Sequence, residues 1–271
     1  MNKSSTKVRA AVYLRPMRGK SYSHLISGSN SKQYVVKFLD NPQHRLVPAN
    51  EWLASHLASL LGLTTPRVTI IDVPECFIQE NPELTFGEPR HEQPHTAGLQ
   101  FGSEMVGGLY PGINTDYLPS SRILSISNRK EFFGALVFDR WVCNADARQA
   151  VFVTRKGRKT IQAHFIDHGH CFGSDTWQLR VPERRSLFFH EAVYYDVTGL
   201  NSFEPWLEKL KTFDDSLLWQ SFATMPAVWY ERSPVKPEAL IDALAKRRHI
   251  VPELIASLAR AQPQAFPLWR D

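Results

Sequence analysis

The sequence has few cysteines and no long apolar run, and each shortage excludes a class of protein. Its 271 residues include three cysteines, Cys76, Cys143 and Cys171, which lie far apart and form no CxxC pair. This odd, scattered set favours reduced, packed thiols over a disulfide framework or a structural zinc site. No hydrophobic stretch approaches the roughly 20 residues that a transmembrane helix needs. Residues 1–10 also lack the apolar core of a signal peptide. The sequence therefore predicts a cytoplasmic protein that does not enter a membrane.

Concentrated charge of one sign is also missing. The net charge is +5, but the basic residues are mixed with Asp and Glu, and the densest basic clusters, at 155–159 and 246–248, are short. Short clusters of this kind are typical of a solvated surface. No helix-turn-helix is recognisable, so direct nucleic-acid binding is not predicted and any DNA binding would require a protein partner. The positive balance does suit an anionic ligand.

Hydrophobic residues make up 43% of the chain, enough for one large domain or two small lobes. The patterns predict a strand-rich first part with one helix, and then a helical part that contains a hairpin. Strands are expected at 8–15, 34–39, 67–73, the start of 98–112, 150–154 and 163–166. Helices are expected at 51–62, with Asn50 as the cap, at 128–143, and over much of the chain after residue 200. Residues 74–96 are expected to be an irregular insertion. Two lobes joined near residues 101–115 follow from this order.

Lys37 is the first candidate functional residue. It alternates with apolar neighbours in the strand YVVKF, and burying its ammonium is costly unless an anion pairs with it. Glu51, at the start of the predicted helix, could hold that ammonium in place for phosphate oxygens. The alternatives are an edge strand with Lys37 facing water, and an acid favoured by the helix dipole alone.

Two aspartates in the second part are the next candidates. Asp146 and Gln149 lie in the loop NADARQ, between a predicted helix and a strand, where catalytic residues are often displayed. Asp167 ends the second hairpin strand, in HFIDHGHCFG, and the hairpin would bring it close to Asp146. Two aspartates beside a lysine suit magnesium and phosphate, because one can bind the metal while the other orients or deprotonates an attacking hydroxyl. The alternative for this loop is that its Asn and Asp only cap backbone groups.

Three segments together resemble the HipA-like kinases: VVKFLDNPQHR…NEWLASHLASLLGL, GALVFDRWVCNADARQAVFV and FIDHGHCF. The resemblance runs from about residue 10 to residue 210, with the motifs in the family's order. It implies an α+β, two-lobed, protein-kinase-like fold shared with phosphatidylinositol 3- and 4-kinases. Residues 1–104 would form the N-lobe and residues 105–271 the helical C-lobe with its catalytic loop and metal-binding hairpin. It also implies ATP and Mg²⁺ as cofactors and γ-phosphate transfer to a hydroxyl. The acceptor would be a protein serine or threonine, although the fold also serves lipids and small molecules.

In the N-lobe, the resemblance makes Lys37 the lysine that contacts ATP phosphates and Glu51 its helix partner. The segment RGKSYS at 18–23 matches the phosphate-covering loop, which would supply backbone donors. The segment FGSEM at 101–105 lies where the hinge to adenine is expected. Besides Lys37, the nucleotide-binding residues implied are Gly19, Lys20, Ser21, Ser23, Gly102 and Glu104.

In the C-lobe, Asp146 matches the catalytic-loop aspartate, and Asp167 matches the metal-binding aspartate of the DFG-type position. Two positions depart from the family pattern. The usual asparagine five residues after the catalytic aspartate is replaced by Val151, which makes Gln149 the nearest candidate metal ligand. Ala147 and Arg148 stand where lipid kinases have Arg-His.

Two other functions remain open. The missing asparagine would suit a pseudokinase, which binds nucleotide or acts as a scaffold without transferring phosphate. The histidines around Asp167 would suit a metal-dependent hydrolase. That hydrolase would need further His or Asp ligands from other segments, and it would leave Lys37 and Glu51 unexplained.

Overall fold

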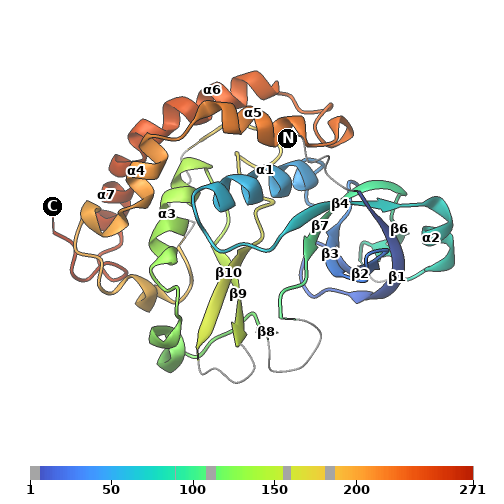
Figure 1. Ribbon diagram of the computed structural model, residues 1–271, viewed down its shortest axis with the longest axis horizontal. Helices are drawn as coiled ribbons and strands as arrows, with labels where there is room; N and C mark the ends of the chain where they lie inside the picture. The colour runs from blue at the N-terminus through green and yellow to red at the C-terminus, as the bar shows by residue number, and fades with distance from the viewer. Residues whose placement is uncertain (1–6, 89, 108–113, 155–159, 181–186, 271) are drawn as a thin grey trace.

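Five strands close into a small barrel in the order β1–β2–β3–β7–β4 (Figure 1). The structure is a computed structural model that describes residues 7–88, 90–107, 114–154, 160–180 and 187–270. β1 pairs antiparallel with β2 and parallel with β4, and the second pairing closes the ring. The barrel strands are β1 (Val8–Pro16), β2 (His24–Gly28), β3 (Gln33–Lys37), β4 (Val68–Val73) and β7 (Gly98–Glu104).

Alternation along β3 sets the direction of its side chains. Tyr34 and Val36 are buried in the hydrophobic cluster that fills the barrel. Because successive residues of a strand point to opposite faces, Lys37 points out of the barrel, toward the rest of the chain.

Residues 74–96 contain regular structure, so the expectation of an irregular insertion was wrong. Pro74 precedes the short helix α2 (Glu75–Glu80), and β5 (Thr85–Phe86) pairs with β6 (Gln93–Pro94). Phe77 and Ile78 of α2 and nearby Leu84 are buried in the barrel cluster. These three apolar side chains explain why the segment folds onto the barrel.

Helix α1 (Val47–Leu60) begins three residues before Asn50, so the predicted cap at Asn50 was wrong. Pro48 stands in the first turn, where the missing N–H costs nothing. Asn50 is therefore inside the helix and fully buried, and Glu51 lies in the second turn rather than the first. The helix ends near Gly62, as the sequence predicted; Gly62 has a positive φ of 85°.

The second part is mainly helical, as predicted, and carries a small sheet (Figure 1). Its strands β8 (Asn114–Thr115), β9 (Gln149–Thr154) and β10 (Ile161–Ile166) form one antiparallel sheet. Its α-helices are α3 (Glu131–Trp141), α4 (Trp206–Lys211), α5 (Asp215–Ala223), α6 (Pro237–Arg247) and α7 (Val251–Ala261). Its 3₁₀ turns are η1 (Ser120–Ser125), η2 (Glu191–Tyr194), η3 (Leu200–Phe203), η4 (Ala227–Trp229) and η5 (Arg248–Ile250). Residues 155–159, between the two strands of the predicted hairpin, and residues 108–113 lie outside the described residues.

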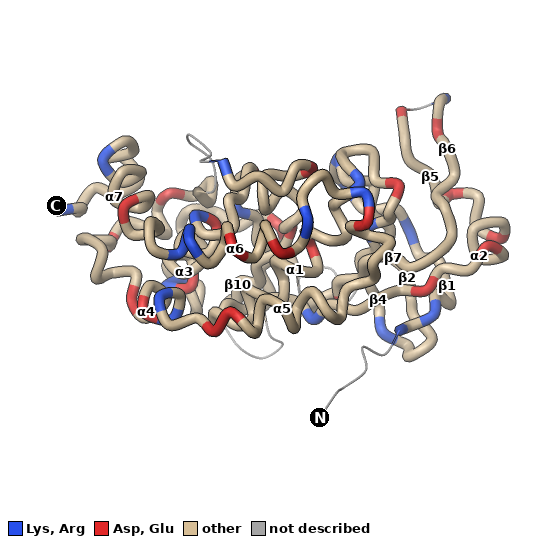
Figure 2. Tube along the Cα trace, turned by 90° about the horizontal axis from the view of Figure 1, so that it is seen from above, with Lys and Arg blue, Asp and Glu red and all other residues tan. Residues whose placement is uncertain are grey.

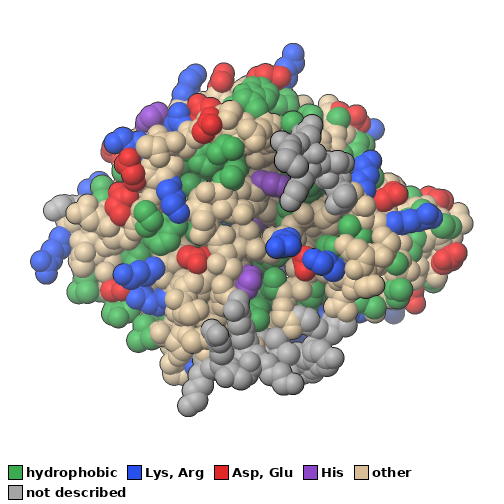
Figure 3. All heavy atoms as spheres, viewed as in Figure 1, with side chains coloured by type: hydrophobic (Ala, Val, Ile, Leu, Met, Phe, Trp, Pro, Cys, Tyr) green, Lys and Arg blue, Asp and Glu red, His purple; other side chains and the backbone are tan. Residues whose placement is uncertain are grey.

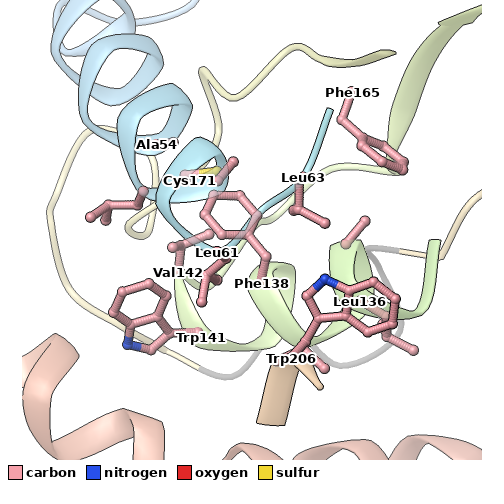
Figure 4. Packing of buried hydrophobic residues seen from close by; sticks show 14 of the residues in the cluster. Ala54, Leu61, Leu63, Leu136, Phe138, Trp141, Val142, Phe165, Cys171 and Trp206 are labelled. Carbon is pink, nitrogen blue, oxygen red and sulfur yellow. The ribbon is translucent and has the colours of Figure 1, made fainter. Parts of the chain in front are cut away.

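One large hydrophobic cluster joins α1 to this helical part (Figure 4). Ala54 and Leu61 from the α1 region lie with Phe138 and Trp141 of α3 in the same core. By packing, α1 thus belongs with the second part, although the chain order places it in the first. A lobe boundary at residues 104 and 105 stays a prediction.

Charged residues of both signs are interspersed along the whole trace (Figure 2). The three cysteines are free thiols, and burial raises the pKa of Cys143 and Cys171. None of the helices in the described part of the chain combines the length and hydrophobicity required to cross a lipid bilayer.

Candidate active site

Three elements bring one ammonium and two carboxylates together. Lys37 is the last residue of β3, Glu51 lies on α1, and Asp167 directly follows β10. Lys37 Nζ donates to Glu51 Oε1 and, at 2.8 Å, to Asp167 Oδ1. Lys37 is 7% exposed and Glu51 3%. The structure thus assembles three of the predicted site residues from segments up to 130 positions apart.

The charges of this cluster favour the ionised forms of Lys37 and Asp167. Burial opposes the Lys37 ammonium, but the charges of Asp167 and Glu51 outweigh it and raise the pKa of Lys37. Burial is the largest single influence on the Asp167 carboxylate and opposes its charge, but the charge and hydrogen bond of Lys37, together with the charge of Arg148, outweigh it and lower the pKa of Asp167 to about 2. For Glu51, burial is the larger effect and raises the pKa against the pull of Lys37. Asp167 is therefore an anion at neutral pH, and its side chain is 26% exposed.

Two neighbouring residues of α1 hold the segment after Asp167. Glu51 Oε1 accepts the backbone N–H of His168 at 3.1 Å. Asn50 Nδ2 lies within hydrogen-bonding distance of three carbonyls, those of Gly169, Cys171 and Ser174 at 2.8, 3.0 and 2.9 Å. Asn50 Oδ1 accepts from Trp177 Nε1 at 2.8 Å. This role of Asn50 was not predicted, because the sequence pattern suggested a helix cap at that position.

The loop that carries Asp146 lies against the same segment. The Ala145 N–H donates to the His170 carbonyl at 3.0 Å. Asp146 is half-buried; its N–H donates to Asn144 Oδ1 at 3.1 Å, and its Oδ1 accepts the Ala147 N–H at 2.7 Å. Asp146 Oδ1 therefore caps a backbone N–H, as the alternative interpretation expected, and this hydrogen bond does not involve Oδ2.

Gln149 and Val151 both lie on β9, opposite β10. Gln149 is exposed and pairs with Ile166, the residue before Asp167, whereas Val151 pairs with His164. The Cα of Gln149 thus lies opposite the residue that precedes Asp167 in the hairpin. Its role as a metal ligand stays a prediction.

The predicted phosphate loop connects β1 to β2. Gly19 has a φ of 113°, in the left-handed region that favours glycine. The Met17 N–H donates to the Ser23 carbonyl at 2.8 Å and closes the loop, and the hydroxyls of Ser21 and Ser23 are 3.2 Å apart. Asn41 Nδ2 donates to the Ser21 carbonyl at 2.8 Å, which ties the loop to the chain just after Lys37. Lys20 at the loop tip is exposed.

The two predicted hinge residues have other neighbours. A side chain at Gly102 would meet Ile71 inside the barrel, on the face of the sheet opposite Lys37. Glu104 accepts from Lys32 Nζ at 2.9 Å. The backbone N–H groups of Glu104 and Met105 donate to the carbonyls of Arg67 and Gln33, so neither is open to adenine. Contact of Gly102 and Glu104 with nucleotide stays a prediction.

Charged side chains and histidines gather where the barrel and the helical part meet, in the middle of one face (Figure 3). Among the described residues, no three His, Cys, Asp or Glu side chains are placed to share a metal ion. His168, the histidine next to Asp167, is 2% exposed, and burial lowers its pKa well below the usual value. The histidines around Asp167 therefore supply no ligand shell of the hydrolase type in this part of the chain.

Sequence analysis also missed a buried ion pair between Asp139 of α3 and Arg148 of the Asp146 loop. The available signal was Asp139 itself, a carboxylate within the otherwise apolar stretch GALVFDRW.

A strand lysine held by a helix glutamate, facing an aspartate from a hairpin, is the arrangement of a kinase-like protein. Comparison with known proteins agrees. The family model of the HipA-like kinases matches residues 10–247. The chain therefore belongs to the HipA-like kinase family.

Solved structures show the same fold. A Fam20 protein from hydra, solved with sugar, gives a TM-score of 0.57 at 12% identity, over 99% of this chain and 90% of the other. A Golgi casein kinase gives 0.51 at 13% identity, over 94% of this chain and 72% of the other. At such low identity these likenesses show the fold alone, and they confirm the predicted two-lobed, kinase-like fold. Comparison with curated protein sequences gives no match.

Proposed function

We propose that this protein is an ATP-dependent phosphotransferase that moves the γ-phosphate of ATP to the hydroxyl of a protein serine or threonine. The observation that carries the proposal is Lys37, which is buried and bonded to both Glu51 and Asp167. Membership of a kinase family supports phosphate transfer in general. The use of ATP and the class of acceptor go beyond it.

Phosphate binding is the role of Lys37 and the loop at 18–23. The Lys37 ammonium supplies charge-assisted hydrogen bonds to phosphate oxygens, and Glu51 fixes its direction. The backbone N–H groups around Gly19 add donors over the phosphates. Because Asn41 anchors this loop beside β3, both sets of donors lie at the same end of the barrel.

Asp167, Gln149 and Asp146 suit magnesium, because each offers the oxygen donors that this ion prefers. Asp167 is ionised, and its Oδ2 makes no hydrogen bond to another described residue. In the proposal, Asp167 and Gln149 hold the ion, which neutralises phosphate charge when bound. Asp146 orients the acceptor hydroxyl and takes its proton.

A pseudokinase is the second candidate function. Position 151, where the family commonly has asparagine, holds a valine, whose side chain has no oxygen to offer to a metal. The same site could then bind nucleotide without transferring phosphate.

Two variants and calorimetry test the assigned roles. Asp167→Asn should weaken the magnesium-dependent part of ATP binding, because it removes the charge that faces the ion. Asp146→Asn should leave Mg-ATP binding nearly unchanged and abolish phosphate transfer. Equal loss of binding in the two variants would show that this division of roles is wrong.

A further inference from the structure

Arg148 is buried, and its guanidinium bonds partners from two segments, α3 and the residues on either side of Asp167. It is 2% exposed, and Asp139 on α3 is fully buried. Arg148 Nε donates to Asp139 Oδ2 at 2.9 Å, and a second guanidinium nitrogen donates to Asp139 Oδ1. Asn144 Nδ2 also donates to Asp139 Oδ1, at 3.1 Å. Since α3 is buried along most of its length, this two-point pairing fixes the guanidinium in the core.

The free edge of the same guanidinium reaches the residues on both sides of Asp167. Arg148 Nη1 donates to the Ile166 carbonyl at 2.8 Å and lies 3.3 Å from His168 Nδ1. Because an arginine can only donate, His168 Nδ1 must be the acceptor, and the imidazole is neutral. Arg148 thus holds the chain immediately before and immediately after Asp167.

Asp167 needs such support because of its backbone. Its φ is 60°, in the left-handed region that side-chain-bearing residues rarely adopt. Glu51 holds the His168 N–H from the side of α1, and Arg148 holds the turn from the side of α3. The charge of Arg148 is paired with that of Asp139 and also helps to lower the pKa of Asp167, while its hydrogen bonds to the chain on both sides of Asp167 fix the direction of that residue.

We propose that Arg148, anchored by Asp139, is a positioning residue that aims the Asp167 carboxylate at the metal ion. This inference rests on the proposed function. It explains why this chain has arginine where lipid kinases have the histidine of Arg-His. The longer, forked arginine side chain reaches the Asp139 carboxylate and the chain around Asp167 at the same time.

Arg148→Met tests the inference, with Arg129→Met as a matched control. Arg129 also makes a two-point pair, with Asp196, and also donates to a backbone carbonyl, that of Val193. It differs in that its hydrogen bonds among the described residues run to Asp196 and Val193 and not to the Asp167 segment. Calorimetry would measure ATP binding with and without magnesium, alongside the magnesium concentration that gives half-maximal transfer.

Arg148→Met should raise the magnesium requirement by roughly tenfold or more, as loss of a partner that orients a metal ligand typically does. Binding of ATP without metal should remain near that of the wild type. Arg129→Met should leave both quantities unchanged. An equal shift in the two variants, or none in Arg148→Met, would overturn the inference and leave Arg148 a purely structural residue.

Arg148→Lys gives a second reading if Arg148→Met does not fold. A single ammonium cannot reach both Asp139 and the Ile166 carbonyl, so a raised magnesium requirement is expected here too. A wild-type requirement in Arg148→Lys would contradict the proposal. Failure of the proposed function looks different, because the wild-type protein itself would then bind no Mg-ATP, or would bind it without transferring phosphate.

Discussion

At the scale of single residues, Lys37 is the central residue of the proposed phosphate site. Its side chain bonds both Glu51 of α1 and Asp167 of the hairpin segment. Its ammonium is already ordered by two carboxylates before any ligand arrives, so little side-chain entropy is lost when phosphate binds. Substitution of Lys37 should therefore directly weaken nucleotide binding.

Lys37→Met should weaken ATP binding by about 1.5–3 kcal/mol, because it removes a charge-assisted contact to phosphate. Isothermal titration calorimetry measures the change. Lys211→Met, which removes a lysine whose side chain is 74% exposed, is the control and should bind as the wild type does. Equal affinity in wild type and Lys37→Met would place the phosphates elsewhere.

Gln149→Ala should raise the magnesium requirement of transfer several-fold, with partial recovery in manganese or excess magnesium. The reason is that the variant removes the side-chain amide oxygen of Gln149, which lies on β9 opposite Ile166, the residue before Asp167. Titration of activity against each metal provides the test. An unchanged titration would assign Gln149 to the exposed start of β9 and leave position 149 without a role at the metal.

At the scale of elements, α1 links the barrel to the segment after Asp167. Its neighbouring residues Asn50 and Glu51 bind that segment at several points, and its apolar face lies in the large core. A helix held this way keeps Glu51 beside Lys37 as long as the core is intact. Its polar bonds should thus contribute to stability as well as to function.

Asn50→Ala should lower the free energy of unfolding by about 2–3 kcal/mol, because it leaves buried carbonyls without a donor. Urea denaturation measures this change. Ser59→Ala, at an exposed position of the same helix, is the control and should stay within about 0.5 kcal/mol of the wild type. A similar small effect in Asn50→Ala would mean that water replaces its bonds.

His24, the first residue of β2, should make the stability of the protein depend on pH. Burial is the main cause that lowers the pKa of His24 to about 4, with His95 adding to it, while Asp40 and the Thr85 carbonyl oppose it. A histidine in the unfolded chain titrates near 6.5. Between about pH 6.5 and 4, His24 binds a proton in the unfolded state but not in the folded state. The contribution of neutral His24 to the unfolding free energy is therefore complete above about pH 6.5 and is lost as the pH falls toward 4.

The expected slope from His24 is at most about 1.4 kcal/mol of unfolding free energy per pH unit. His24→Gln should flatten the profile between pH 7 and pH 5, because glutamine stays neutral and can still donate to the Thr85 carbonyl. Urea denaturation at a series of pH values compares the two proteins. Parallel profiles would show that other groups set the dependence.

At the scale of the whole molecule, the sequence predicted what depends on local pattern. The alternation in YVVKF predicted a strand that carries Lys37, and the helical spacing after residue 50 predicted a helix that carries Glu51. The pairing of these two side chains was implied by the resemblance to the HipA-like kinases. Closure of the barrel by β1 and β4 could not be predicted, because the pairing joins residues far apart in the chain. The bonds of Asn50 escaped because the residue was taken for a helix cap and because they run to a segment 119 residues away. Those of Arg148 escaped because they depend on burial of its guanidinium against Asp139, which the polar loop sequence does not indicate.

The central claim is that this site moves the γ-phosphate of ATP to a protein hydroxyl. The most direct measurement is incubation of the purified protein with γ-labelled ATP, magnesium and a cell lysate, followed by identification of the labelled residue. The account predicts label on serine or threonine with the wild type and none with Asp146→Asn. Mg-ATP binding without labelled protein in the wild-type reaction would contradict it and favour the pseudokinase.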